Sequence, residues 1–325
     1  MSKFILEVEN LTKHFPVNRG FFSGPTTYAR AVDGLSFFIK KGETLGLVGE
    51  SGCGKSTVAR LLTRLEEPTD GCIKLDGQDK RHLSQSELVL YRQKIQMVFQ
   101  DSVSSLHPRM SAGDLVAEPF HIHKLVPRNK INGRVKDLFE SVGLNQEMLK
   151  RFPHELSGGQ CQRLSVARAL AVNPLLLVSD EAVSALDVSI QAQVINLFRD
   201  LQDRLNLSYL FISHDMAVVG LISHRIAVMY LGQILEIGAK GDVIKEPLHP
   251  YTRALLDASP IPNSKRRNRR HNLIQGELPS PINPPTGCRF HPRCPLAETR
   301  CSSEIPKLLD RGSEHFVACH LADKL

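Results

Sequence analysis

The chain has 325 residues, 42% of them hydrophobic, and a formal net charge of +7. This length suits one ordinary domain with a sizeable extension, and the apolar content is enough for a packed core. No unbroken apolar run is long enough to cross a membrane, and Glu7 and Glu9 interrupt the segment where a secretion signal would be apolar. We therefore expect a cytosolic protein that reaches a membrane only through partners.

The positive charge is partly concentrated in residues 265–270, KRRNRR, which lie in a proline-rich stretch. Such a cluster would suit nucleic acid or anionic lipid. Because no aromatic residues alternate with these cations, base stacking is not expected here. A solvated linker is therefore favoured over a specific nucleic-acid site.

In chain order, the hydrophobic pattern predicts four regions. Residues 6–45 favour an antiparallel β subdomain, with a hairpin-like insertion rich in glycine and aromatics at 18–29. Residues 46–100 and 173–238 favour the two halves of an α/β core, and residues 101–172 favour a helical subdomain. We place a main domain at 1–258 and a C-terminal extension at 259–325.

Residues 49–57, GESGCGKST, fill every fixed position of the phosphate-binding loop G-x-x-x-x-G-K-[ST]. An apolar run at 44–48 predicts the buried strand before this loop, and residues 58–62 continue a helix whose N-terminus would face the anion. In such loops, backbone N–H groups surround the phosphates, a lysine contacts the β- and γ-phosphate oxygens, and a hydroxyl binds Mg²⁺. The residues predicted to bind a nucleoside triphosphate in this way are Gly49, Ser51, Gly52, Cys53, Gly54, Lys55, Ser56 and Thr57.

A second anion site is predicted at residues 156–160, LSGGQ, directly before an apolar helical pattern. Ser157 is a natural N-cap, and Gly158 and Gly159 leave the first N–H groups of the helix uncovered for a phosphate. Taken alone, the motif could also be a capped surface helix.

Together these motifs resemble those of the ATP-binding subunits of ABC transporters, in which LSGGQ is the family signature. Four further motifs follow in family order: the Q-loop at 98–101, Walker B with the catalytic glutamate at 175–181, the D-loop at 184–187 and the H-loop at 212–215. The resemblance implies a P-loop NTPase fold of ABC type, which is an α/β fold. It comprises a RecA-like core, an antiparallel β subdomain, a helical subdomain and here a small C-terminal cysteine-containing extension.

The apolar run at 175–178 predicts a parallel strand covered on both faces, which delivers Asp180 to the sheet edge where ligands bind. There Asp180 can hold the Mg²⁺ shell, and Glu181 can orient the attacking water or accept its proton. The resemblance implies catalytic roles for Lys55, Gln100, Glu181 and His214. It implies Mg²⁺ ligation by Ser56, Gln100 and Asp180, and it adds to the ATP-binding residues Ser157, Gly158, Gly159, Gln160 and Asp187.

For the adenine base, the family uses an aromatic side chain from the loop after the first strand. Phe15 occupies that position, and Tyr28 is the competing candidate. An aromatic side chain in the insertion at 18–29 is otherwise most simply a packing residue.

The final stretch resembles the extension of dipeptide and oligopeptide importer ATPases, through HPYT at 249–252 and GELPSP at 276–281. The resemblance implies an ATPase, peripheral on the cytoplasmic face of the bacterial inner membrane, that energises import of di- or oligopeptides. Its partners would be two transmembrane permeases, a second ATP-binding subunit, either identical or paralogous, and a separate solute-binding protein. In the family, phosphate loop and signature of one chain lie too far apart to share one ATP, so two chains close head to tail.

Three alternatives stay open at this point. The solute could be nickel or another small molecule, because other polypeptides recognise it. A soluble ABC ATPase acting on nucleic acid would be expected to carry tandem cassettes, coiled coils or zinc inserts, whereas this chain shows one cassette. A non-catalytic nucleotide-binding partner would not need Glu181 and His214, which this sequence retains.

The cysteines fall into two groups. Three are scattered singles, expected to be reduced thiols: Cys53, Cys72 and Cys161. Four cluster in the loop-rich tail, where a metal or cluster site is expected: Cys288, Cys294, Cys301 and Cys319. In the importer family this pattern is associated with a [4Fe–4S] cluster, which we rank above Zn²⁺ and above free thiols. His291, His315 and His320 keep zinc open. Nothing in the spacing places this site near Lys55, so a structural role is expected.

Two positions depart from the family pattern. Ala182 stands where proline usually follows the catalytic glutamate, and Cys161 stands where a basic residue usually follows the signature. The first change loosens a turn and the second removes a charge from a helix start. Because neither position supplies a catalytic atom, we expect effects on efficiency more than on mechanism.

Overall fold

The computed structural model describes residues 3–17, 27–81, 83–184, 186–258 and 276–324. The chain forms two compact units. The first contains residues 1–39, 44–81 and 211–325, and the second contains residues 40–43 and 82–210. Among the described residues, no helix combines the length and apolar character needed to span a bilayer.

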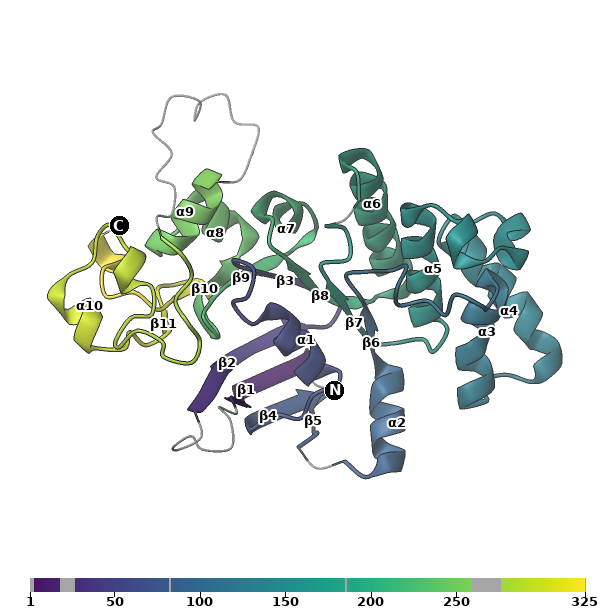
Figure 1. Cartoon of the computed structure of the whole chain (residues 1–325), viewed down its shortest axis with the longest axis horizontal. Helices are drawn as coiled ribbons and strands as arrows, with labels where there is room; N and C mark the ends of the chain where they lie inside the picture. The colour runs from purple at the N-terminus through teal and green to yellow at the C-terminus, as the bar shows by residue number, and fades with distance from the viewer. Residues whose placement is uncertain (1–2, 18–26, 82, 185, 259–275, 325) are drawn as a thin grey trace. The chain divides into compact units, whose positions relative to one another are not determined.

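The first unit contains an antiparallel sheet with the strand order β2-β1-β4-β5 (Figure 1). Its strands are β1 (Phe4–Val17), β2 (Thr27–Lys40), β4 (Asp70–Leu75) and β5 (Gln78–Asp79). The predicted β subdomain therefore exists, but its boundary at residue 45 was wrong, because β4 and β5 were assigned to the α/β core. The reason is non-local pairing: Leu6 lies opposite Leu75 and Val8 opposite Ile73, across more than sixty residues of chain.

The first unit also holds most strands of a second sheet. Strand β3 (Thr44–Val48) is parallel to β9 (Arg225–Tyr230), which is antiparallel to β10 (Gln233–Ala239). Every residue of β3 and β9 is buried, and for β3 this is as expected from the apolar run predicted at 44–48. Two short strands of the C-terminal extension, β12 (Phe316–Val317) and β11 (Leu309–Asp310), continue the sheet beyond β10.

Short helices accompany these strands. They are α1 (Lys55–Leu62), α7 (Met216–Ile222), α8 (Lys240–Lys245), α9 (Pro250–Ala258) and α10 (Thr299–Ser303). Helix α7 packs so closely on β3 that a Cβ on Gly46 would lie 2.2 Å from a methyl carbon of Val219. Glycine is therefore required in this strand because of a close approach and not because of its backbone angles.

The second unit combines two parallel strands with helices, as predicted for the helical residues 101–172 and for the strand at 175–178. Strand β6 (Ile95–Val98) pairs with β7 (Leu176–Asp180). The helices are α2 (Gln85–Lys94), α3 (Ala112–His123), α4 (Arg128–Ser141), α5 (Gly158–Leu170) and α6 (Val188–Leu205). Helix α4 buries Ile131, Val135 and Phe139 at the helical spacing of its sequence. Strand β8 (Ser208–Ser213) begins in this unit and ends in the first.

The described part of the extension, residues 276–324, packs on the first unit through an aromatic cluster. The buried ring of Phe290 lies edge-on to Tyr230, with centroids 5.4 Å apart, and 5.2 Å from the ring of Tyr251. The extension is therefore packed against aromatic side chains of β9 and α9, a contact that the composition of the sequence did not reveal. The domain boundary placed at 258 stays a prediction, since residues 259–275 lie outside the described part.

Candidate nucleotide site and cysteine segment

The phosphate loop leaves β3 after Val48 and ends where α1 begins at Lys55. Gly54, the N-cap of α1, has a φ of 109°, a left-handed conformation that favours glycine. A Cβ at this position would also lie 2.2 Å from the backbone oxygen of Ala31. The fixed glycine of the motif is thus required twice over, by its backbone angle and by the neighbouring strand. The helix start behind it exposes the N–H groups that an anion needs.

Lys55 is folded back over its own loop. Its ammonium donates to the carbonyl oxygens of Gly49 at 2.7 Å and of Glu50 at 2.9 Å, and the residue is 4% exposed. The charge is therefore held at the loop by two acceptors that phosphate oxygens can replace. Ser56 and Thr57, predicted to face Mg²⁺ and phosphate, occupy the first turn of α1 and are half-buried.

In the second unit, β7 carries Asp180 at its C-terminal end, 5% exposed. Glu181 follows with a φ of +46°, a left-handed angle that is uncommon outside glycine and costs free energy. The amide Nε2 of Gln100, beyond the end of β6, donates to Glu181 Oε2 at 2.9 Å. Two neighbouring parallel strands thus bring the predicted Q-loop glutamine and the predicted catalytic carboxylate into direct contact.

The signature segment forms the predicted N-cap. The Ser157 hydroxyl accepts the Gln160 N–H at 3.3 Å, and the Gln160 side chain accepts the Ser157 N–H at 2.9 Å. This reciprocal capping box fixes the start of α5 while Ser157 and Gly158 stay exposed. A Cβ on Gly159 would lie 2.6 Å from a methyl carbon of Ile190 on α6, so glycine is needed for packing.

The remaining predicted residues are placed as follows. His214 is exposed directly after β8, and Asp187 is exposed at the N-cap position of α6. Phe15 lies on β1, half-buried, with the Lys13 ammonium 4.9 Å from its ring centroid. Tyr28 on β2 is 49% exposed. The choice between these two aromatics for adenine stays a prediction.

Both departures from the family pattern are buried. Ala182 is covered directly after the Glu181 turn, and the Cys161 thiol donates to the backbone oxygen of Pro153 at 3.5 Å. Burial raises the pKa of the Cys161 thiol, so it is an inert core group. Cys161 therefore supports the base of the signature helix from inside the second unit.

The four tail cysteines lie in one segment and within electrostatic range of one another. The Cys288 N–H donates to the Cys301 oxygen at 2.8 Å. Burial raises the pKa of the Cys288 thiol to about 11, with smaller upward contributions from Cys319, Cys301 and Cys294. Across the described residues, no three or more Cys, His, Asp or Glu side chains are arranged to hold a single metal ion.

The extension also reaches the phosphate loop, which sequence reasoning missed. Arg293, next to Cys294, donates to both carboxylate oxygens of Glu50, at 2.9 and 3.1 Å. The spacing of the cysteines gave no sign of this approach, and the structural role expected for the cysteine site stays a prediction. The two residues are 243 positions apart, and no local pattern in the sequence pairs them.

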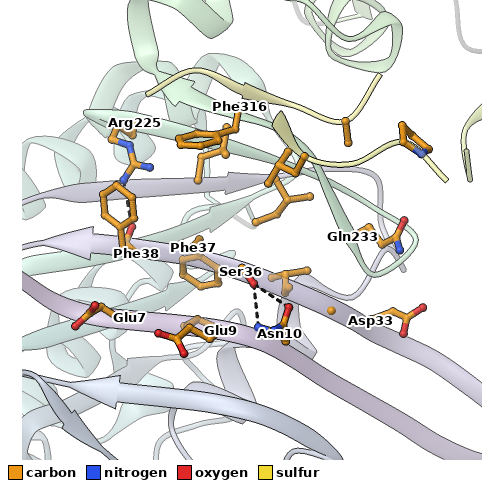
Figure 2. Close-up of a pocket in the computed structure, with 18 of the residues that line it drawn as sticks. Glu7, Glu9, Asn10, Asp33, Ser36, Phe37, Phe38, Arg225, Gln233 and Phe316 are labelled. Carbon is orange, nitrogen blue, oxygen red and sulfur yellow. Dashed lines mark hydrogen bonds between the residues drawn. The ribbon is translucent and has the colours of Figure 1, made fainter. Parts of the chain in front are cut away.

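A separate cavity of about 560 Å³ lies between β1, β2, β10 and the extension, and Figure 2 shows its lining. It is largely apolar, with Phe37 and Phe316 among its walls. The guanidinium of Arg225 lies 4.1 Å from the ring centroid of Phe38 and donates to the Phe38 oxygen at 3.1 Å. None of the residues predicted to bind nucleotide lines this cavity.

The fold and the phosphate loop define an ABC-type ATPase. Residues 32–184 match the family model for the ABC transporter, and residues 235–301 match the model for the C-terminal region of the oligopeptide/dipeptide transporter. A solved dimeric ATP-binding cassette, MJ0796 bound to ADP and Pi in a post-hydrolysis state, superposes with a TM-score of 0.63. It is 28% identical and covers 72% of this chain and 98% of its own.

Curated relatives are similar over nearly the whole length. The oligopeptide transport ATP-binding protein AppF of Bacillus subtilis is 50% identical, over 98% of this chain and 97% of the relative. OppF of Escherichia coli, also an oligopeptide transport ATP-binding protein, is 47% identical over 99% of this chain and 98% of its own. The chain belongs to the oligopeptide/dipeptide transport family of ABC transporter ATP-binding proteins.

Proposed function

We propose that this chain hydrolyses ATP to energise import of di- or oligopeptides through partner permeases at the cytoplasmic face of the bacterial inner membrane. The observation that carries the proposal is the match of residues 235–301 to the C-terminal region of oligopeptide/dipeptide transporters. Relatives that are named as oligopeptide or di/tripeptide transport proteins and align over nearly the whole chain support it. These relatives favour a peptide over nickel as the solute, and a transport function over action on nucleic acid.

In the proposed cycle, ATP joins two ATP-binding subunits head to tail. Lys55 of one subunit binds the β- and γ-phosphates while Ser157 and Gly159 of the other approach the γ-phosphate. The exposed, capped start of α5 supports this role, because uncovered N–H groups at a helix start need an acceptor. Glu181 orients the attacking water and accepts its proton, while Gln100, Ser56 and Asp180 hold Mg²⁺.

Hydrolysis then separates the subunits and resets the permeases. The contact between Gln100 and Glu181 supports a coupling role for the Q-loop, since a change at the carboxylate must alter the amide that donates to it. The partner subunits are two permeases, a second ATPase that is identical or paralogous, and a separate solute-binding protein.

The test is peptide uptake by the reconstituted system. The chain would be assembled in proteoliposomes with its genomically neighbouring permeases, ATPase and binding protein, and uptake of labelled tripeptide would be measured with ATP inside. We expect ATP-dependent uptake that Lys55→Ala abolishes, while Lys3→Ala, which lies outside the phosphate loop, leaves it unchanged. Uptake of nickel without uptake of any peptide from two to five residues would overturn the peptide assignment.

We further propose that the four tail cysteines ligate one [4Fe–4S] cluster, with Zn²⁺ as the alternative. The grouping of four cysteines in one short segment supports this proposal, since Cys294, Cys301 and Cys319 all act electrostatically on the Cys288 thiol. When bound, such a group would cross-link four points of a segment with a small core of its own.

Metal analysis of the anaerobically purified chain tests this assignment. We expect brown protein with about four irons and four sulfides per chain. Cys301→Ser should lose this content, whereas Cys72→Ser, a matched change of a buried cysteine on β4, should keep it. Stoichiometric zinc in colourless protein would overturn the cluster and keep the site, and metal-free protein would overturn both.

A further inference from the structure

Glu50 of the phosphate loop is held through its side chain by the cysteine segment. Besides the two bonds to the carboxylate, the Arg293 guanidinium donates to the Tyr230 hydroxyl at 3.3 Å. The Arg293 side chain is 8% exposed and that of Glu50 is 25% exposed. This is a largely covered, charge-assisted pair, which solvent and salt screen much less than a surface pair.

The same residue is held through its backbone by a tyrosine on α9. The Glu50 N–H donates to the Tyr251 hydroxyl at 2.9 Å. The fully buried Tyr251 ring lies 4.8 Å from the Tyr230 ring, which Arg293 also contacts. One loop residue is thus clamped at two points by groups that share one aromatic cluster, so neither point moves without the other.

The contacts of Arg293 and Tyr251 with Glu50 bear on nucleotide binding because of the position of Glu50 in the phosphate loop. It is the second residue of a loop whose N–H groups must point at phosphates, and its carbonyl oxygen accepts from Lys55. A carboxylate next to a triphosphate repels it, more strongly in a partly buried place than in water. Arg293 cancels that charge and fixes the direction of the side chain.

We propose that Arg293 is a positioning residue of the ATP site, which makes ATP affinity depend on the folded state of the cysteine segment. Arg293 fixes and neutralises Glu50, and Tyr251 fixes the backbone of the same residue. The proposal rests on ATP binding by the phosphate loop and is independent of which solute is transported. It assigns to the extension a role at the nucleotide site in addition to its own folding.

The experiment measures ATP and ADP affinity of the full-length chain by titration with a fluorescent nucleotide and competition. Arg293→Met should weaken ATP binding about tenfold, which is about 1.4 kcal/mol. ADP, with fewer phosphate charges, should lose less. The double variant Arg293→Met with Glu50→Gln should bind ATP within about twofold of wild type, because no unpaired carboxylate remains.

Arg300→Met is the matched control. Arg300 precedes Cys301 in the same segment, just as Arg293 precedes Cys294, but it contacts Glu298 and the His320 oxygen within the extension. We expect wild-type ATP affinity for this variant. In turnover with the membrane partners, Arg293→Met should raise KM for ATP with little change in kcat, because the reacting groups Glu181 and Gln100 are untouched.

Two results would overturn the proposal. One is equal ATP affinity of the Arg293→Met and Arg300→Met proteins. The other is a double variant as weak as Arg293→Met alone, since that would trace the effect to lost packing and not to Glu50. If Arg293→Met does not fold, Arg293→Lys serves instead: it keeps the charge but lacks the guanidinium nitrogen Nη1 that donates to both Glu50 and Tyr230. Its ATP affinity should therefore fall between that of wild type and the tenfold loss. Wild-type protein without ATP affinity would instead refute the nucleotide site itself.

Discussion

Protonation of one buried histidine should destabilise the folded chain. His249 lies at the start of α9, 1% exposed, and its Nδ1 accepts the Tyr251 N–H at 3.0 Å. Its backbone N–H donates to Glu236, a fully buried carboxylate that also bonds His315 at 2.8 Å. Burial lowers the pKa of His249 from 6.5 to about 4, although Glu236 acts in the opposite direction. The ring is therefore neutral in the folded protein at neutral pH.

The magnitude follows from linkage. The folded pKa lies below the unfolded one, so the unfolded chain binds the proton first and stability falls as pH drops from 6.5 toward 4. With these two values, the loss between pH 6.5 and about pH 4.5 is about 2 kcal/mol. His315 has the opposite sign: its bond to Glu236 raises its pKa, so its contribution is present below its unfolded pKa and is lost at higher pH. The contribution of His315 to stability therefore changes little between pH 6.5 and about pH 4.5.

The assay is urea unfolding of the full-length chain at several pH values and constant ionic strength, followed by tyrosine fluorescence. The chain has five tyrosines and no tryptophan, and Tyr230 and Tyr251 lie in the cluster beside His249. We expect His249→Gln to remove about 2 kcal/mol of the pH dependence, since its amide can still accept the Tyr251 N–H. His121→Gln, an exposed position on α3, should keep the wild-type dependence. Equal pH dependence in wild type and His249→Gln would refute the reasoning.

Three further predictions concern turnover. Glu181→Gln should keep ATP binding and reduce hydrolysis about a thousandfold, trapping an ATP-bound dimer; persisting wild-type hydrolysis with the membrane partners present would remove Glu181 from catalysis. Mixing Lys55→Ala with Gly159→Asp protein should recover about a quarter of the active sites of a dimer of this chain, because half the dimers are mixed and each of these has one intact site. If mixed dimers form but do not hydrolyse ATP, the shared site is rejected. Ser157→Ala removes the acceptor of the Gln160 N–H. It should lower the free energy of unfolding by about 1 kcal/mol and slow turnover, without changing ATP binding to the monomer. Thermal melting and nucleotide titration would check these effects.

The parts of the molecule that could be predicted from the sequence are those set by local chemistry. The buried run at 44–48 became β3, and Ser157 became an N-cap because its hydroxyl and the Gln160 amide lie one helical turn apart. The membership of β4 in the antiparallel sheet escaped prediction, since it depends on pairing with β1 and not on its own pattern. The left-handed angle of Glu181 likewise had no signal, because only the turn after β7 imposes it.

The contacts between the extension and the phosphate loop also explain why the Arg293 effect should be partial. A second arginine, Arg289, is also adjacent to a tail cysteine, Cys288, and it contacts Asp33 and the Leu231 oxygen. Gly232, which follows Leu231 in the chain, donates its N–H to the Cys53 oxygen in the phosphate loop at 2.9 Å, and its own oxygen accepts the Asp33 N–H at 2.9 Å. The extension thus reaches the loop by two routes, one ending at Glu50 and one at Cys53. Loss of Arg293 leaves the second route intact, so weakened ATP binding is expected and not its loss.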